Sequence, residues 1–146
     1  MQYKLLTGII IALVIHSCKT SQSTLNTSSQ AGTTSESLDT SKWYLTKIHQ
    51  PTGTIEVNGK KAFIRFNLVK GSAGGNGSCN SFGSAVTVNG DTISFKNIFS
   101  TKMYCEAVQS IENSFLDQLQ KVSRYEIKEK TLLLFEGEKV MLEFEK

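Results

Sequence analysis

The sequence has few of the residues from which metal and redox sites are usually built. Its 146 residues include two histidines, three cysteines and one proline. No two cysteines form a C-x-x-C pair, which argues against a dithiol redox motif. Beyond residue 18, only His49 could join two cysteines as a zinc ligand, and that set is too small. From these absences we expect no metal, no cofactor and no catalytic residues.

Long runs of charge are also missing. The formal net charge is +3, and no block of like charge is longer than the pair Lys60-Lys61. A nucleic-acid-binding protein would show lysines and arginines clustered on one face. We therefore expect no nucleic-acid partner.

The longest apolar run is too short to cross a membrane. It extends from Leu5 to Ile15, whereas a transmembrane helix needs about 20 apolar residues. Ser17 and Cys18 follow it, which is typical of a lipoprotein signal peptide over residues 1–17, cleaved before Cys18. The cysteine sulfur would then carry an acyl lipid such as palmitate. A plain secretory signal is the alternative, but it usually ends in small residues at both −3 and −1, and Ile15 occupies −3 here.

Removal of the signal peptide leaves one domain preceded by a polar segment. Thirteen of the 23 residues from Lys19 to Ser41 are serine or threonine. Such a segment buries too little apolar surface to offset its ordering entropy. We therefore expect residues 18–41 to form the lipidated cysteine and a flexible tether, and residues 42–146 to form the folded domain.

Residues 42–146 carry mainly strand patterns. In residues 61–68, Ala62, Ile64, Phe66 and Leu68 alternate with other side chains, which predicts a strand with one buried face. Asn58-Gly59 and Asn89-Gly90 each predict a tight hairpin turn. Further strands are expected at 42–48, 54–57, 85–88, 91–95, 124–127, 131–135 and 139–144, with a glycine-rich loop at 71–83. The aromatic residues expected in the core are Trp43, Phe63, Phe66, Phe82, Phe95 and Phe115.

One segment has a helical period. Val108, Ile111, Phe115, Leu119 and Val122 recur every three or four residues, which predicts an amphipathic helix between Glu106 and Val122. The sequence therefore predicts an α+β fold, mainly antiparallel β, with about eight strands and a helix after the fifth.

If Cys18 carries the lipid, Cys79 and Cys105 remain as an even pair in an oxidising compartment. A structural disulfide between them would stabilise the domain by roughly 3–4 kcal/mol in the chain-entropy treatment. Free thiols and a catalytic thiol remain the alternatives.

Three separated motifs resemble the META domain family, which includes HslJ-like heat-shock lipoproteins. They are the loop Gly77-Ser78-Cys79-Asn80-Ser81-Phe82-Gly83, the segment Thr101-Lys102-Met103-Tyr104-Cys105, and a helix bearing Glu112 and Phe115, preceded by an opening Trp43-Tyr44-Leu45. Ser78 and Tyr104 depart from the pattern, since glycine and a small residue are usual there. The resemblance implies a cracked, lipocalin-like barrel packed against one helix, an envelope location, an association with heat stress and no established catalytic mechanism.

The resemblance also implies that Gly77, Asn80 and Gly83 shape a turn which the cysteines tie to the segment entering the helix. A phosphate-binding reading of this glycine-rich loop is weaker, because no Lys-Ser/Thr pair follows it. Arg65 is expected on the polar face of its strand, although in an open barrel it could face inward and contact an anionic ligand. His49, beside the only proline, is expected in a loop.

The leading hypothesis is a non-enzymatic, monomeric lipoprotein, anchored to the outer membrane of a bacterial envelope and facing the periplasm. Its partners would be the membrane, through the lipid, and another envelope protein. The alternative is a carrier of a small hydrophobic or lipid-like molecule, which requires a cavity of several hundred Å³ inside the barrel. An enzyme such as a thiol oxidoreductase is the third hypothesis and requires an exposed Cys79 beside a cation.

Overall fold

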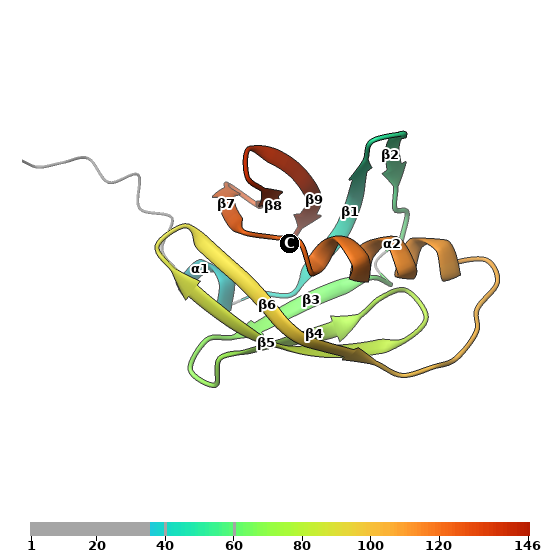
Figure 1. The fold of residues 1–146 in the computed structure, drawn as a ribbon, viewed down its shortest axis with the longest axis horizontal. Coiled ribbons are helices and arrows are strands. Elements are labelled where there is room, and N and C mark those ends of the chain that lie inside the picture. The colour runs from blue at the N-terminus through green and yellow to red at the C-terminus, as the bar shows by residue number, and fades with distance from the viewer. Residues whose placement is uncertain (1–35, 40, 60) are drawn as a thin grey trace, which may run out of the picture. The chain divides into compact units, whose positions relative to one another are not determined.

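The computed structural model describes residues 36–39, 41–59 and 61–146, and they form a mostly antiparallel sheet with two helices (Figure 1). The predicted signal peptide, Cys18 and residues 19–35 of the tether lie outside the described residues. Neither helix of the described part is long and apolar enough to cross a membrane. The elements are α1 Glu36–Asp39, β1 Trp43–Gln50, β2 Gly53–Glu56, β3 Phe63–Asn67, β4 Ser72–Asn76, β5 Ser81–Asn89, β6 Thr92–Ser100, α2 Gln109–Leu119, β7 Arg124–Lys128, β8 Thr131–Glu136 and β9 Lys139–Glu145.

Eight of these strands form a ring, because β1 pairs with β3 on one side and with β9 on the other. The ring continues in sequence order from β3 to β9, and every pairing is antiparallel. β2 lies outside it and pairs only with the second half of β1. The predicted barrel of about eight strands is therefore confirmed.

The ring is incomplete between β6 and β7. These strands are paired only at Thr92 and Arg124, near the start of each. Helix α2, which connects them, packs Phe115 into the core, where its ring contacts Phe82 of β5 and Phe144 of β9 at centroid distances of 5.4 and 5.9 Å. The helix thus supplies the apolar contacts that the missing strand pairs would have supplied, and the barrel is cracked as expected.

Inward-facing apolar side chains fill the interior. The alternation predicted for residues 61–68 is confirmed, since Ala62, Ile64 and Phe66 are buried. Five of the six aromatic residues expected in the core are buried, and Phe63 is half-buried against Tyr44. The largest fully buried side chains are Trp43, Tyr125, Phe115, Phe144, Leu38, Leu45, Ile48, Ile64, Ile93, Leu119, Leu132 and Leu134.

Several expectations about the elements were wrong. The glycine-rich segment contains strand β4, so α2 follows the sixth strand, and the helix spans 109–119 rather than 106–122. Asn58-Gly59 does not join a hairpin, because β2 and β3 both pair with β1; the hairpin turn lies at Pro51-Thr52. Helix α1 packs on the domain, since Leu38 is buried and its carbonyl accepts a hydrogen bond from the Trp43 indole (3.3 Å). Residues 36–39 therefore belong with the domain rather than with a tether.

Candidate functional site

The first motif forms the loop of the β4–β5 hairpin. The Gly77 N–H donates to the Asn80 carbonyl (2.7 Å), and the Ser78 N–H donates to Asn76 Oδ1 (2.9 Å). Ser78 has φ +112°, a conformation that favours glycine. This explains why glycine is usual at that position and identifies Ser78 as a strained departure from the pattern.

Asn80 joins this loop to the segment that leaves β6. Its side chain is 2 % exposed, and its Oδ1 accepts hydrogen bonds from Thr101 Oγ1 (2.9 Å) and the Met103 N–H (2.7 Å). Its Nδ2 donates to the Met103 carbonyl (2.9 Å) and to Glu112 Oε1 (2.6 Å). All four hydrogen-bonding positions of the amide are thus used.

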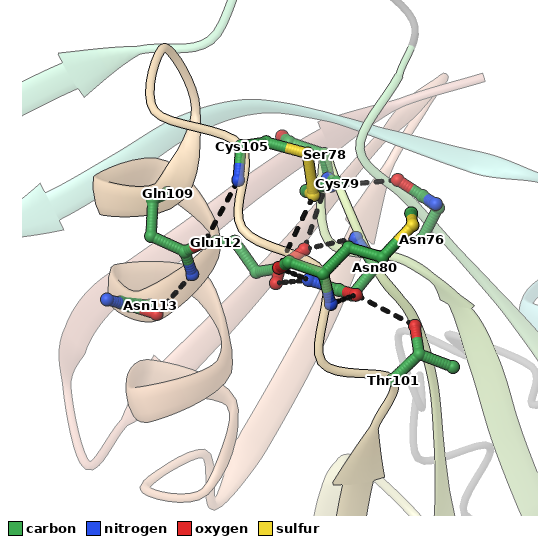
Figure 2. Close-up of a disulfide and its surroundings, with 10 residues drawn as sticks. Asn76, Ser78, Cys79, Asn80, Thr101, Cys105, Gln109, Glu112 and Asn113 are labelled. Carbon is green, nitrogen blue, oxygen red and sulfur yellow. Dashed lines mark hydrogen bonds between the residues drawn. A yellow bond between two sulfur atoms is a disulfide. The ribbon is translucent and has the colours of Figure 1, made fainter.

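Glu112, in the first turn of α2, completes the network (Figure 2). Glu112 is 3 % exposed, and its Oε2 accepts hydrogen bonds from the backbone N–H groups of Cys79 (3.1 Å) and Asn80 (2.6 Å). Together with the bond from Asn80 Nδ2, the Glu112 carboxyl oxygens accept three hydrogen bonds. We call the side chains of Asn80, Thr101 and Glu112, with the backbone that they bind, the Asn80–Glu112 network.

Two glycines of the motif lie against side chains, Gly77 against the buried Glu112 and Gly83 against the exposed Phe99. A Cβ on Gly77 would lie 2.8 Å from Oε2 of Glu112, and one on Gly83 would lie 2.6 Å from the ring of Phe99. A Cβ on Gly75 of β4 would lie 2.0 Å from the Phe63 carbonyl oxygen. The glycines therefore allow strands and side chains to approach, which favours the turn interpretation over phosphate binding.

The two remaining cysteines form the predicted disulfide. Cys79 and Cys105 are bonded, with their Cα atoms 6.0 Å apart, and they are 26 positions apart in sequence. The bond lies beside the Asn80–Glu112 network and links the same two segments, the hairpin loop and the turn that leads into α2 (Figure 2). Both devices hold the start of α2 against the sheet.

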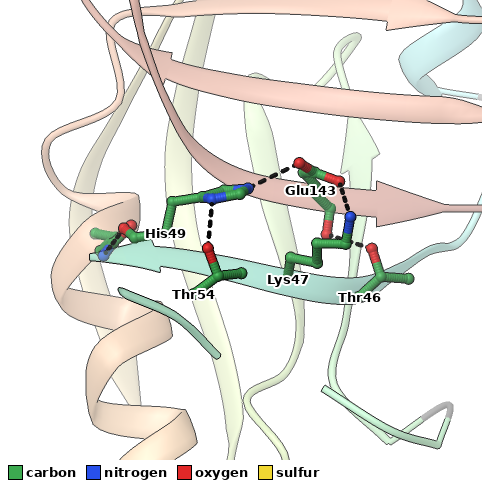
Figure 3. A network of polar contacts seen from close by, with 6 residues as sticks. Thr46, Lys47, His49, Thr54 and Glu143 are labelled. Carbon is green, nitrogen blue, oxygen red and sulfur yellow. Dashed lines mark hydrogen bonds and ion pairs between the residues drawn. The ribbon is translucent and has the colours of Figure 1, made fainter. Parts of the chain in front are cut away.

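A second polar cluster lies on the outer face of β1 and β9 (Figure 3). Glu143 of β9 contacts His49 Nε2 (2.7 Å) and Lys47 Nζ (3.3 Å), and His49 Nδ1 lies 3.0 Å from Thr54 Oγ1 on β2. Partial burial alone would raise the pKa of the Glu143 carboxyl, but the hydrogen bonds from His49 and Lys47 outweigh it and hold the pKa below its ordinary value of 4.5. His49 is therefore in a strand, not in the predicted loop, and helps to pin β2 and β9 to β1.

We expect Glu143→Gln to lower the free energy of unfolding at pH 7 by about 0.5–1 kcal/mol, because two favourable ion contacts are lost. A carboxylate whose pKa is lowered by folding stabilises above its unfolded pKa, and this stability is lost as pH falls through the folded value. The difference from the wild type should therefore shrink as the pH falls below 4.5 and vanish once the pH is below the folded pKa of Glu143. Urea unfolding from pH 7 to pH 3 measures it, with the exposed Glu145→Gln on the same strand as control. A difference that persists at pH 3 would contradict the ionic origin.

A surface groove runs between the second half of β6 and helix α2. It consists of two adjoining hollows of about 290 and 470 Å³, both lined by Ser100, Lys102, Asn113 and Leu116. The first also includes Asn80, Met103, Tyr104 and Glu112, and the second includes Ile98 and Phe99. We call this the β6–α2 groove. Met103 and Tyr104 are both exposed on its rim.

The structure brings Gly77, Cys79, Asn80 and Cys105 together, as the motifs suggested, but it does not bring Arg65 to them. The expectation that Gly83 helps to shape the turn was wrong, because Gly83 lies within strand β5, where it pairs with Gly74 and Phe99. Arg65 is exposed, because its neighbours Ile64 and Phe66 take the inward positions of β3. The idea that Arg65 faces the barrel interior was therefore wrong. The sequence did not predict that Glu112 is the acceptor at the centre of the network. The one sign of it in the motif is Gly77, whose lack of a side chain leaves room for the Glu112 carboxyl.

The disulfide and the Asn80–Glu112 network hold segments of the chain together, and the fold is a ring-like antiparallel sheet closed by one helix. Within the described residues, no group of three or more histidine, cysteine, aspartate or glutamate side chains could hold a metal ion. These features define a small β-domain with a structural, disulfide-linked motif.

The sequence matches the META domain over residues 36–146, and the chain belongs to this family. Its fold resembles that of a protein from Burkholderia xenovorans determined by NMR, with a TM-score of 0.62, 21% identity, and coverage of 75% of this chain and 83% of that one. A second NMR structure gives a TM-score of 0.58 and 18% identity over 77% of this chain and 93% of that one. No curated protein matches the sequence. The META domain is not known as an enzyme family.

Proposed function

We propose that this protein is a lipid-anchored envelope lipoprotein whose META domain binds another envelope component instead of catalysing a reaction. The observation that carries the anchor is the layout of residues 1–18, an apolar run of 11 residues followed by Ser17 and Cys18. The disulfide between Cys79 and Cys105 supports the same compartment, since such bonds persist outside the cytosol.

The hydrogen bonds within the motif support binding over catalysis, because its polar side chains are already used to hold the fold together. Asn80 uses all its hydrogen-bonding positions within the fold, and Glu112 accepts three donors. Cys79 is bonded to Cys105, and so is not an available thiolate nucleophile. The chemically capable side chains of the motif are thus committed to structure.

The carrier alternative needs room inside the barrel, and the packing of the interior argues against it. Trp43, Phe115, Tyr125 and Phe144 are each at most 1 % exposed. The two hollows described above are open to the surface between β6 and α2. A stress-related role follows from the family resemblance, and a deletion strain tested at raised temperature would examine it.

Cys18→Ala tests the anchor. We expect the wild-type chain in the membrane fraction, labelled by radioactive palmitate, and the variant unlabelled, uncleaved and slower on a denaturing gel. The double variant Cys79→Ala/Cys105→Ala is the matched control, because it removes the other two cysteines and should keep the label. If Cys18→Ala left both membrane attachment and gel mobility unaltered, the anchor would be disproved.

A further inference from the structure

The edge of β6 that faces α2 lacks a strand neighbour over most of its length. On this side the Ile93 N–H donates to the Ser123 carbonyl, and among the described strands no pairing continues past Thr92. At the far end, the Thr101 N–H donates to Ser81 on the opposite side, toward β5. Because hydrogen-bonding directions alternate along a strand, Ser100 presents its backbone N–H and C=O to the β6–α2 groove. No backbone hydrogen bond within the described residues reaches Ser100 from the groove.

The rim of the same groove is apolar. Four large apolar side chains of the described residues are exposed, and three lie here: Phe99 (70 %), Met103 (62 %) and Tyr104 (77 %). A bulge explains the position of Phe99: β6 shifts register opposite Gly83 and Ala85, and Asn97 has φ +53°. An exposed apolar cluster beside an open strand edge is typical of a binding site for an extended peptide.

The groove is lined by one lysine and two acidic residues, and both acidic residues are already engaged within the described part of the chain. Glu112 lines the first hollow, and its carboxyl oxygens accept three hydrogen bonds from Cys79 and Asn80. Lys102 lines both hollows, and it makes no ion pair with a described carboxylate. Asp117 also lines the second hollow, but its carboxylate is 2.6 Å from Lys121 Nζ. A carboxylate on the occupant would therefore be favoured near Lys102.

We propose that the β6–α2 groove binds an extended, acidic and apolar segment of a partner protein, which adds a strand to β6. Its backbone would pair with Ser100, alternate apolar side chains would pack on Phe99 and Met103, and a carboxylate would meet Lys102. This inference rests on the proposed binding role and specifies the surface at which the partner binds. The chain's own residues 19–35 do not fit the groove, because they contain Leu25 as the only large apolar residue and no acidic residue.

The test uses the full-length chain and a display library of random nine-residue peptides. Selected peptides should lack proline, alternate apolar residues and carry at least one aspartate or glutamate. Ser100→Pro removes the outward N–H but no bond to β5, so an edge position should tolerate it. We expect Ser100→Pro to weaken binding of the selected peptides by at least about tenfold, as loss of a central contact does, and Ser100→Ala, which keeps the N–H, to bind as the wild type. Lys102→Glu should also weaken binding, and Lys96→Glu, which makes the same charge change on β6 away from the groove, should not.

Two results would overturn the proposal: no enrichment over the Ser100→Pro chain, or selected peptides that bind Ser100→Pro and wild type equally. Light scattering of the purified chain identifies the competing occupant, since a dimer abolished by Ser100→Pro would show that a second copy fills the groove. The circular dichroism spectrum of Ser100→Pro confirms that it is folded. Palmitate labelling of Cys18 in the same preparations reports the anchor separately, so a failed anchor and an empty groove give different results.

Discussion

Glu112→Ala should be among the most destabilising single substitutions in the domain, lowering the free energy of unfolding by about 3–5 kcal/mol, because three hydrogen-bond donors lose their acceptor where the fold excludes water. The substitution leaves three donors without an acceptor: the backbone N–H groups of Cys79 and Asn80, and Asn80 Nδ2. Each buried unpaired group costs about 1–3 kcal/mol. Urea unfolding of the full-length oxidised chain at pH 7, followed by Trp43 fluorescence, measures the loss.

Two further variants separate the possible causes. Glu112→Gln keeps the size of the side chain but points an NH₂ group at a donor. We therefore expect it to lower the free energy of unfolding, but by less than Glu112→Ala does. Glu106→Ala removes an exposed carboxylate from the turn before α2 and should change stability by less than about 0.5 kcal/mol. If Glu112→Ala unfolded within 1 kcal/mol of Glu106→Ala, the network would not be what holds α2 to the sheet.

The sequence predicted the parts of the fold that depend on neighbouring residues. Asn89-Gly90 predicted the β5–β6 hairpin, whose two turn residues are Gly90 and Asp91, because such a turn needs a positive φ, which Gly90 has at +60°. The three- and four-residue spacing around Phe115 gave α2 because one face of a helix must be apolar. In both cases the local pattern and the final packing agree.

Strand β4 was missed for a physical reason. Its sequence, SAGGN, has neither the branched side chains nor the alternation by which a strand is recognised. Gly75 is in a strand because the Phe63 backbone approaches where a side chain would lie, and that constraint comes from a residue 12 positions earlier. Strand β1 could not be placed from its neighbours in sequence either. It pairs with β3 on one side, but on the other it pairs with β9, where Leu45 lies opposite Phe144, almost 100 residues away.

For the candidate site, too, the sequence predicted the residues but not the contacts between them. The residues of the motif could be named from their resemblance to a family, and the structure brings them into one cluster. Which atom binds which could not be deduced, because Glu112 and Cys79 are 33 positions apart and meet only after the ring has formed. The β6–α2 groove was not predicted either. It exists because β6 and β7 pair only at Thr92, and a pairing between strands cannot be seen in the sequence of either strand.

Reduction of the Cys79–Cys105 disulfide should lower the free energy of unfolding by about 3.5 kcal/mol, the chain-entropy value for a loop of this length. In that treatment the bond acts on the unfolded chain, which it keeps from expanding. The reduced chain should therefore expose more surface when it unfolds, and its dependence of stability on urea concentration, the m-value, should increase. A loss of native contacts alone would lower the stability and leave the m-value unchanged.

Two preparations test this mechanism. Cys79→Ala/Cys105→Ala should unfold at the same urea concentration as the wild type treated with reductant, and reductant should not affect the double variant. The Asn80–Glu112 network links the same segments without a covalent bond, so the reduced chain should still fold and keep its native circular dichroism spectrum. An unfolded reduced chain at 25 °C would show that the network cannot hold the start of α2 by itself. An unchanged midpoint after reduction would instead show that the disulfide adds nothing to stability.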